Sequence, residues 1–401
     1  MFREEIENHL RECLLPFWMN LRDDENGGYY GYADFDLNVD KTAEKGCILN
    51  SRILWFFSSC YVLLKDKRYL AYADHAYEFL RTYFYDTEYG GVIWSVDFKG
   101  KKLDMTKHTY CQAFAIYGLS AYYEASGKRE SLELAKDFIN VIETDCRDND
   151  GYLEAFNRDF SPASNEKLSE NGIIAERTMN TLLHVFEAYT EFYRVTESIE
   201  ESDLKLYRGE VRKKIKDQLS ILKNRMFNPK KNRLEVFFDI NYNSLLDLIS
   251  YGHDIETAWL VDRGLDILGE EELKREYSPM TGRLAKNILN NAFDGKSLPQ
   301  ECEAGRVDES RVWWAQAEAI NGFMNEYIKD PSNEAFKTAV LSEWEYIKSH
   351  VIYRQSGGEW YARLDKEGRP DNKKAVVEPW KCPYHNGRMC IEVLRRWGTG
   401  F

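Results

Sequence analysis

The chain has 401 residues, of which 43% are hydrophobic and 14% are aromatic, and its formal net charge is −13. Because its 54 Lys and Arg residues are dispersed among 67 Asp and Glu residues, no surface that could follow a phosphate backbone is predicted, and nucleic acid is excluded as a partner. The N-terminus carries charges where a signal peptide needs an apolar core, and the longest apolar run, 53–64, is too short to span a bilayer. We therefore expect a cytoplasmic protein without a membrane partner.

The eight cysteines include no Cys-x-x-Cys pair, so neither a disulfide framework nor a zinc site is indicated. Glycine-rich nucleotide-binding patterns are also absent from the sequence. We therefore expect no cofactor.

A short phrase of glycine followed by aromatic residues recurs along the chain. The intervals between its first three copies are 91 − 28 = 63 and 151 − 91 = 60 residues. The first three copies follow an acidic or Asn-containing turn. All copies predict a β-hairpin, because glycine supplies the conformation that the turn needs. The copies lie at 27–30, 90–94, 151–152 and 357–361, with weaker ones at 228–238 and 294–298.

Two sets of predicted helices alternate between these phrases. One set is amphipathic, which is typical of outer helices with one wet face, and covers 3–19, 68–85, 129–145, 202–225, 270–292 and 332–350. The other set is apolar nearly all round, which is typical of buried helices, and covers 46–65, 106–126, 175–196, 251–268, 310–328 and 383–397.

Six inner and six outer helices predict an all-α fold, an (α/α)6 barrel with short β-hairpins on the loop face. Length alone would suggest two or three domains. The repeat runs through the whole chain without a Pro/Ser/Gly-rich linker, however, so we expect one catalytic domain over 1–401. The alternative is an open α-solenoid, which the same repeat would also produce.

Polar and aromatic side chains stand near the N-terminal ends of the six inner helices, where they would face one mouth of the barrel. For any one of them, a hydrogen-bonded position in the core is the better interpretation, but their recurrence in all six units favours a site. They are Arg52, Tyr110, Asn180, His184, His253, Glu256, Trp313, Trp314, Glu318, Trp380 and His385.

Histidine is the usual residue for moving protons near neutral pH. His253 and His385 begin inner helices, where the helix dipole disfavours the imidazolium form and keeps a neutral base available. His184 lies one turn after Asn180, so the two share a helix face. Two neutral imidazoles from separate helices can flank a bound substrate. By contrast, we interpret the histidines of the outer helices as structural or surface residues: His9, His75 and His350.

A divalent metal ion is the chemical alternative. His253 and Glu256 are three residues apart and, with His184 and His385, could bind one. The sequence contains no His-x-x-x-His and no second ligand pair of metal-site spacing. We therefore expect no metal site.

Five segments resemble those of the N-acylglucosamine 2-epimerase superfamily, and the likeness runs from residue 16 to the last helix. The resemblance implies an (α/α)6 barrel and an isomerase, a carbohydrate epimerase whose chemistry uses neither metal nor nucleotide. The expected partner is a disaccharide, and the expected state is a monomer. The segments are 52–56, 179–184, 250–256, 311–318 and 380–388.

The resemblance also implies roles. His253 and His385 would remove and return the proton on carbon 2 of the reducing-end glucose of β-1,4-linked disaccharides such as cellobiose and lactose, through a cis-enediolate, to give mannose. Arg52 and His184 would stabilise the charge on the oxygens of carbons 1 and 2, and Glu256 would orient His253 or hold a hydroxyl. The remaining residues would bind the sugars: Trp259, Trp314 and Glu318 by holding them, Trp313 and Trp380 by lining the mouth, and Tyr110 and Asn180 by contacting the reacting ring.

Other functions stay open at this point. The same superfamily includes N-acylglucosamine 2-epimerases and aldose–ketose isomerases. A glycoside hydrolase on this fold would need two carboxylates, for which Glu256, Asp254 and Glu318 are candidates. A sugar-binding protein without activity is the remaining alternative. The tryptophans at the mouth offer more flat surface than one sugar ring would occupy, which favours a disaccharide.

Overall fold

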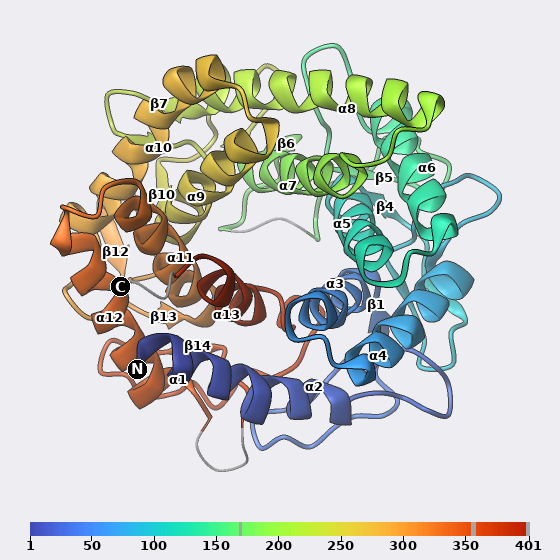
Figure 1. The fold of residues 1–401 in the computed structure, drawn as a ribbon, viewed down its shortest axis with the longest axis horizontal. Coiled ribbons are helices and arrows are strands. Elements are labelled where there is room, and N and C mark those ends of the chain that lie inside the picture. The colour runs from blue at the N-terminus through green and yellow to red at the C-terminus, as the bar shows by residue number, and fades with distance from the viewer. Residues whose placement is uncertain (168–170, 354–357, 398–401) are drawn as a thin grey trace.

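Two concentric rings of helices form the computed structural model, which describes residues 1–167, 171–353 and 358–397 (Figure 1). The inner ring consists of α3 (Cys47–Leu64), α5 (Thr109–Ser126), α7 (Met179–Thr196), α9 (Tyr251–Leu268), α11 (Trp313–Lys329) and α13 (His385–Arg396). The outer ring consists of α1 (Phe2–His9) with α2 (Leu15–Asn20), α4 (Lys67–Phe79), α6 (Arg129–Asp145), α8 (Ser202–Ile221), α10 (Glu271–Asn291) and α12 (Glu334–Tyr346).

Four of the outer helices include a π-helical turn. One such turn joins α1 to α2, and the other three end the helices that they follow. They are η1 (Leu10–Leu14), η2 (Leu80–Phe84) after α4, η3 (Leu222–Met226) after α8 and η4 (Ile347–Val351) after α12.

The predicted helices are confirmed to within about one turn. The clearest differences are at the starts of α5, α7 and α11, predicted at 106, 175 and 310 but observed at Thr109, Met179 and Trp313. The residues before these helices form short strands instead, namely β4 (Lys107–His108), β6 (Arg177–Thr178) and β13 (Arg311–Val312).

The inner helices are buried on nearly all sides. Helix α3 is, by length and composition, able to cross a membrane, contrary to the expectation from the run 53–64, but 78% of it is buried inside the protein. Its neighbours are α4, α5 and α13. The outer helices bury one face each, as in α6, where Leu132, Ala135, Phe138, Ile139 and Ile142 are buried at helical spacing.

The inner ring is closed. Each inner helix contacts the next in chain order, and α13 contacts α3. The N-terminal helix α1 packs against α13, where the rings of Phe2 and Trp397 lie 4.8 Å apart. The closed barrel is therefore confirmed, and the open solenoid is wrong (Figure 1).

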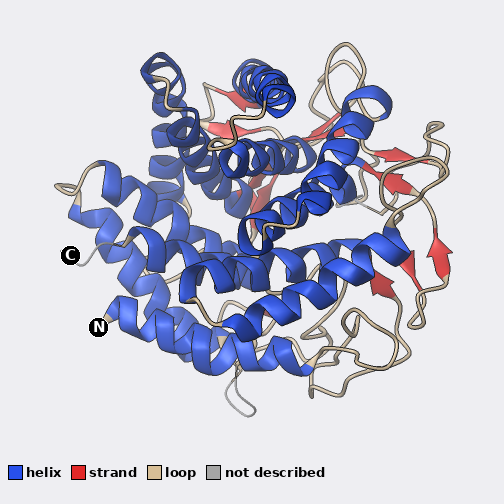
Figure 2. Ribbon diagram, turned by 45° about the vertical axis from the view of Figure 1, so that its right-hand side comes forward, coloured by secondary structure: helices blue, strands red, loops and turns tan. Residues whose placement is uncertain are grey.

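Short strands lie to one side of the helices (Figure 2). Most of the strands that precede inner helices pair with a strand from the following unit, so they tie neighbouring units together. These sheets are β1 (Lys45–Gly46) with β2 (Ser95–Val96) and β3 (Lys102–Asp104); β4 with β5 (Ala155–Phe156); β6 with β9 (Phe237–Phe238); β10 (Leu248–Ser250) with β11 (Glu301–Glu303) and β12 (Arg306–Asp308); and β13 (Arg311–Val312) with β14 (Arg363–Leu364). A further pair, β7 (Phe227–Asn228) with β8 (Arg233–Leu234), forms a hairpin within one unit.

Most of the predicted glycine hairpins are present, and most of these are closed by a single bridge. Examples are Arg22 with Tyr29, Tyr85 with Val92, Arg147 with Tyr152, and Ile352 with Trp360. The predicted copy at 294–298 is instead a turn, in which the Asp294 N–H bonds the Ser297 carbonyl, and the structure assigns no strand or bridge to these residues. Of the last phrase, Gly357 lies outside the described residues.

In several inner helices, the fourth residue has a polar side chain that accepts a hydrogen bond from the backbone just after a neighbouring turn. Gln112 of α5 accepts a hydrogen bond from the Val92 N–H at 2.7 Å and donates one to the Val92 carbonyl at 2.8 Å. Gly91 must lack a side chain here, because its φ is +67° and a Cβ atom would lie 2.6 Å from Gln112 Oε1. Likewise, the side-chain oxygens of Asn50 (α3), Asp254 (α9) and Gln316 (α11) accept hydrogen bonds from the backbone N–H groups of Tyr29, Leu234 and Leu298, respectively.

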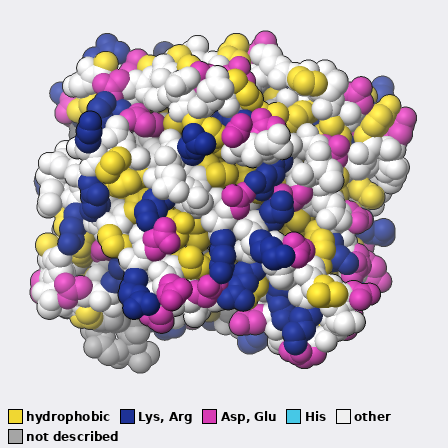
Figure 3. Space-filling view, turned by 90° about the horizontal axis from the view of Figure 1, so that it is seen from above, with side chains coloured by type: hydrophobic (Ala, Val, Ile, Leu, Met, Phe, Trp, Pro, Cys, Tyr) yellow, Lys and Arg dark blue, Asp and Glu magenta, His cyan; other side chains and the backbone are white. Residues whose placement is uncertain are grey.

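Lys and Arg side chains alternate with Asp and Glu over the face shown in Figure 3. This mixture agrees with the dispersed charges of the sequence.

Candidate active site

A cavity of about 440 Å³ opens at the end of the barrel where the inner helices begin. This volume falls in the range of ligand-binding pockets, roughly 300–1,000 Å³. Ten of the twelve predicted site residues line it: Arg52, Tyr110, Asn180, His184, His253, Glu256, Trp313, Trp314, Trp380 and His385.

The three cavity histidines share one arrangement. Each has its Nδ1 atom within hydrogen-bond distance of a buried protein oxygen: Glu187 at 3.0 Å from His184, Ser250 at 2.7 Å from His253, and Glu318 at 2.8 Å from His385. No side chain in the described part of the chain bonds their Nε2 atoms. The Nε2 atoms are therefore the ones available to a ligand in the cavity.

Burial keeps these imidazoles neutral. It lowers the pKa of His184 to about 4 and that of His253 to about 3. The pKa of His385 is also well below its usual value, first because of burial and then because of the positive charge of Arg388. The prediction of neutral bases at these positions is thus supported, although burial rather than the helix dipole is the main cause.

Arg52 brings a positive charge to the cavity that no carboxylate neutralises within the described ranges. Its guanidinium donates to the Tyr110 hydroxyl at 2.8 Å and to the Trp380 carbonyl at 3.2 Å. It also lies 4.0 Å from the centre of the Phe114 ring. Neutral partners therefore hold the guanidinium in place and leave its charge available to an anion.

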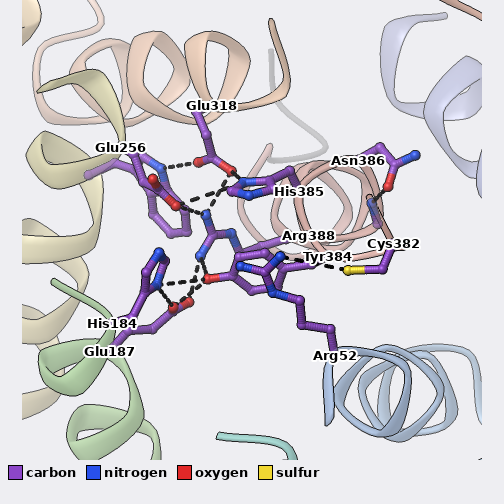
Figure 4. A network of polar contacts seen from close by, with 12 residues as sticks. Arg52, His184, Glu187, Glu256, Glu318, Cys382, Tyr384, His385, Asn386 and Arg388 are labelled. Carbon is purple, nitrogen blue, oxygen red and sulfur yellow. Dashed lines mark hydrogen bonds and ion pairs between the residues drawn. The ribbon is translucent and has the colours of Figure 1, made fainter. Parts of the chain in front are cut away.

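Arg388 is the centre of a buried network that the sequence did not indicate (Figure 4). Its guanidinium bonds Glu187 at 2.6 Å, Glu318 at 2.7 Å and also Glu256. Two of these carboxylates are the partners of His184 and His385. Arg388 therefore fixes the groups that orient two of the histidines. The only sequence signal was spacing: Glu187 and Arg388 each follow a site histidine by three residues.

Three possible metal ligands come together, namely Glu256, Glu318 and His385, whose ligand atoms lie within 4.8 Å of one another. Arg388 bonds both carboxylates. A fixed cation thus already lies where a divalent ion would bind, so these residues fit a role as the ion partners of Arg388 better than a role as metal ligands.

Trp259 and Glu318 require a correction, because they lie behind the cavity wall. Trp259 is 1% exposed, and its Nε1 atom donates to Glu318 at 2.8 Å. The Arg388 guanidinium lies 4.9 Å from the Trp259 ring. Both residues therefore support the site from behind. Neither lines the cavity, so the structure does not place them where they would contact a sugar.

Glu256 also differs from expectation. It lines the cavity but bonds Arg388, and it lies 3.9 Å from Nδ1 of His385. Ser250 is the partner of His253 instead. Burial, and next the negative charge of Glu318, raise the pKa of Glu256 to about 8. Glu256 can therefore carry a proton at neutral pH and donate a hydrogen bond into the cavity.

Four buried polar atoms of cavity residues have no hydrogen-bond partner among the described residues. They are Arg52 Nε, Asn180 Oδ1, Glu256 Oε2 and Trp313 Nε1. Buried polar atoms without partners are costly and rare in proteins, so these four are the natural contacts for the oxygen atoms of a ligand.

Trp314 contacts both proton-transfer candidates. Its ring centre lies 4.6 Å from that of His253 and 5.6 Å from that of His385. Trp380, at the rim, lies 5.7 Å from the Tyr110 ring. A flat apolar wall thus adjoins the imidazoles, as sugar rings require for stacking.

Further lining residues, which come mainly from the short strands and loops, were missed by sequence reasoning. They follow no periodicity, so no pattern could mark them. They are Lys167, Thr178, Val236, Phe237, Gln300, Val312, Ala362, Arg363, Lys374 and Glu378, with Thr181 from α7.

Comparison with known proteins fits this geometry. The profile of the N-acylglucosamine 2-epimerase (GlcNAc 2-epimerase) family matches residues 27–386. The chain is 46% identical to a cellobiose 2-epimerase of Eubacterium cellulosolvens, over 98% of each chain. Its structure resembles the crystal structure of a sugar epimerase from a ruminal bacterium, with a TM-score of 0.94 and 46% identity over 99% of each chain. It also resembles the cellobiose 2-epimerase of Bacillus thermoamylovorans, with a TM-score of 0.92 and 44% identity over 98% of this chain and 99% of that one.

The closed double ring of helices and these relatives together define an enzyme that converts sugars. The chain belongs to the N-acylglucosamine 2-epimerase family and is a carbohydrate epimerase.

Proposed function

We propose that the protein interconverts glucose and mannose at the reducing end of β-1,4-linked disaccharides. The observation that carries this proposal is the common arrangement of His184, His253 and His385, whose Nδ1 atoms are bonded to protein and whose Nε2 atoms are left for the cavity. The relatives named cellobiose 2-epimerase support the substrate class.

The proposed reaction begins with the open-chain sugar, whose carbon 2 proton is acidified by the adjacent aldehyde. The neutral imidazole of His253 or His385 removes this proton with its Nε2 atom, and the C–H electron pair forms the double bond of an enediolate. Rotation about the bond between carbons 2 and 3 presents the other face of carbon 2. The second histidine, protonated from solvent while the enediolate carries its negative charge, then gives a proton to carbon 2 and becomes neutral, and the first histidine releases its proton to solvent.

Arg52 is suited to the negative charge that appears on the enediolate oxygens. Its guanidinium donates hydrogen bonds to neutral groups, the Tyr110 hydroxyl and the Trp380 carbonyl. No described carboxylate therefore neutralises its charge. Charge stabilisation that exists mainly in the transition state raises turnover more than binding. His184, 5.1 Å from Tyr110 by ring centres, lies beside this group and would assist it.

The cavity also favours the disaccharide over a single sugar. The three histidines are buried, whereas Trp380 and Arg363 of β14, which also line the cavity, are partly exposed and so mark its outer part. A second ring would bind in this outer part. A monosaccharide such as N-acetylglucosamine would leave it empty.

A hydrolase is less well supported, because two of its three candidate carboxylates do not line the cavity. Asp254 accepts the backbone N–H of Leu234, and Glu318 contacts His385. Glu256, the third, is paired with Arg388. Acid–base cleavage needs two carboxylates that flank the scissile bond, and these residues do not provide them.

The test is to incubate the enzyme with cellobiose in deuterium oxide and identify the products. We expect glucosyl-mannose with deuterium at carbon 2, because the returned proton comes from an imidazole that exchanges with solvent. Replacing His253 or His385 with Phe should reduce turnover by about 10²–10⁴, as expected for a lost general acid or base. Free glucose would indicate a hydrolase, a ketose product would indicate an isomerase, and equal turnover of N-acetylglucosamine would favour an N-acyl epimerase.

A further inference from the structure

Ser250 is the N-cap residue of α9, yet its side chain does not cap the helix. Serine is favoured at this position because its hydroxyl can accept a hydrogen bond from the first turn. Thr178 does so at the start of α7, where it accepts the Thr181 N–H at 3.1 Å. The Ser250 hydroxyl instead lies 2.7 Å from Nδ1 of His253. The Ser250 hydroxyl thus bonds a cavity histidine in place of the backbone N–H group that a serine at this position usually bonds.

The backbone around Ser250 fixes this contact. Ser250 is the last residue of β10 and pairs with Glu301 of β11. It is 6% exposed, and His253 is 8% exposed. Neither side chain therefore has much freedom to leave the other.

The two other cavity histidines show what such a contact does. Glu187 and Glu318 are the Nδ1 partners of His184 and His385. A carboxylate can only accept a hydrogen bond, so it holds the proton on Nδ1 and leaves the Nε2 lone pair free. The hydroxyl oxygen of Ser250, 2.7 Å from Nδ1, can act as the same kind of acceptor for His253.

We propose that Ser250 is a positioning residue for His253: its hydroxyl accepts the Nδ1–H bond, so that Nε2 is the atom that exchanges a proton in the cavity. This inference rests on the proposed function for its kinetic consequences, but not for its structural ones.

Other groups also act on His253, and all of them stay unchanged when Ser250 is replaced. His184 on α7 and Glu318 on α11 influence its charge. The ring of Trp314, also on α11, lies against it. A change that follows substitution of Ser250 alone can therefore be assigned to the lost hydroxyl.

The decisive experiment compares Ser250→Ala with Ser250→Thr, which keeps a hydroxyl. Ser131→Ala is the matched control, because the buried Ser131 hydroxyl donates a 2.8 Å hydrogen bond to the Lys128 carbonyl on the outer ring. The first measurement is a long-range ¹H–¹⁵N spectrum of protein labelled in its histidines, with the His253 signals identified by their loss in His253→Phe. It needs no enzymatic activity.

We expect His253 to carry its proton on Nδ1 in the wild type, in Ser250→Thr and in Ser131→Ala, and to become a mixture of the two neutral forms in Ser250→Ala. With cellobiose, kcat of Ser250→Ala should fall about tenfold or more, the effect of a hydrogen bond lost from a transition state, with KM within about twofold. Its pH profile should shift, and Ser250→Thr should restore both.

Unchanged His253 signals in a folded Ser250→Ala protein would overturn the inference. A wild type that does not epimerise cellobiose, with His253 signals that do respond to Ser250→Ala, would instead refute the proposed function and leave the positioning role standing.

Discussion

At the level of single residues, the cavity side chains depend on a second layer of buried residues. The histidines face the cavity, but the atoms that orient them belong to Glu187, Ser250 and Glu318. Trp259 and Arg388 in turn hold the carboxylates. Changes in this layer should therefore alter the rate of the reaction more than the binding of the sugar.

Trp259 offers a direct test of this distinction. Trp259→Phe removes the Nε1 donor that lies 2.8 Å from Glu318, so we expect kcat to fall about tenfold while KM stays within about twofold. Trp314→Phe is the comparison, because Trp314 lines the cavity and its change should mainly raise KM for cellobiose. If Trp259→Phe raised KM and left kcat intact, Trp259 would be a sugar contact after all.

Chelation tests the interpretation of the carboxylate cluster. Because Arg388 bonds Glu256 and Glu318, we expect activity to survive exhaustive treatment with EDTA. The measurement is the rate of cellobiose conversion before and after chelation, with the metal content checked by elemental analysis. Loss of activity that a single divalent ion restores would show that a metal takes part.

The sequence predicted ten of the residues at the cavity surface, but it missed the strand and loop residues around them and the layer behind them. Helical periodicity shows which residues share a face, and so it placed His184 beside Asn180. It does not show which side chain reaches across the barrel. Arg388 and Glu187 are 201 residues apart in the chain, and no local pattern links them. The same limit explains why Trp259, one turn beyond Glu256, was predicted to face the cavity although it bonds Glu318 behind the lining residues.

At the level of helices and strands, the apolar periodicity was sufficient to predict both rings. What it missed were the strand pairs between units, because two-residue strands carry no period. The hydrogen bonds from Gln112 and its counterparts were missed for a different reason. A single amide in an apolar helix looks like any other buried polar residue until its partner, here the Val92 backbone, is known.

Asp254 occupies one of these positions as a carboxyl, where Asn50, Gln112 and Gln316 are amides. Burial raises its pKa to about 8, above the unfolded value of about 3.9. The stability that it contributes is therefore present at low pH and lost as the pH rises through about 8. Asp254→Asn should remove this loss, so its free energy of unfolding should fall less steeply than that of the wild type between pH 5 and pH 8, by about 1.4 kcal/mol per pH unit.

Chemical denaturation at several pH values measures this difference. Asp266→Asn is the control, because the Asp266 side chain is 68% exposed and its replacement should leave the slope unchanged. Equal slopes for the wild type and Asp254→Asn would show that Asp254 is ionised in the folded protein.

At the level of the whole molecule, the ring is closed by contacts between its first and last units. The indole N–H of Trp18 donates to Glu359 at 2.6 Å, and that of Trp360 donates to Nε2 of His9 at 2.9 Å. A bridge between Ala33 and Val377 adds a backbone connection. We call these three contacts the seam. His9, interpreted from the sequence as structural or surface, is a buried structural residue.

Acid should weaken the seam through His9. Burial lowers its pKa to about 4, below the unfolded value of about 6.5, so its contribution to stability is complete above pH 6.5 and lost as the pH falls toward 4. His9→Gln keeps an acceptor for Trp360 but does not titrate. Its free energy of unfolding should therefore fall less steeply than that of the wild type over this range, by about 1.4 kcal/mol per pH unit.

The comparison is made by denaturation between pH 4 and pH 7, with His350→Gln as the control on η4. The control should follow the wild type. If His9→Gln had the same slope as the wild type, the pKa of His9 in the folded protein would not be lowered by its burial.

Helix α13 both closes the ring and supplies His385 and Arg388. It is also the last of the described helices to leave the ribosome. Without α13, the carboxylates Glu187, Glu256 and Glu318 would have no guanidinium between them. One helix thus supplies the cation for these carboxylates, the contact that joins α11 to α3, and one of the two proposed proton-transfer residues, so a chain that lacks α13 would lose all three together.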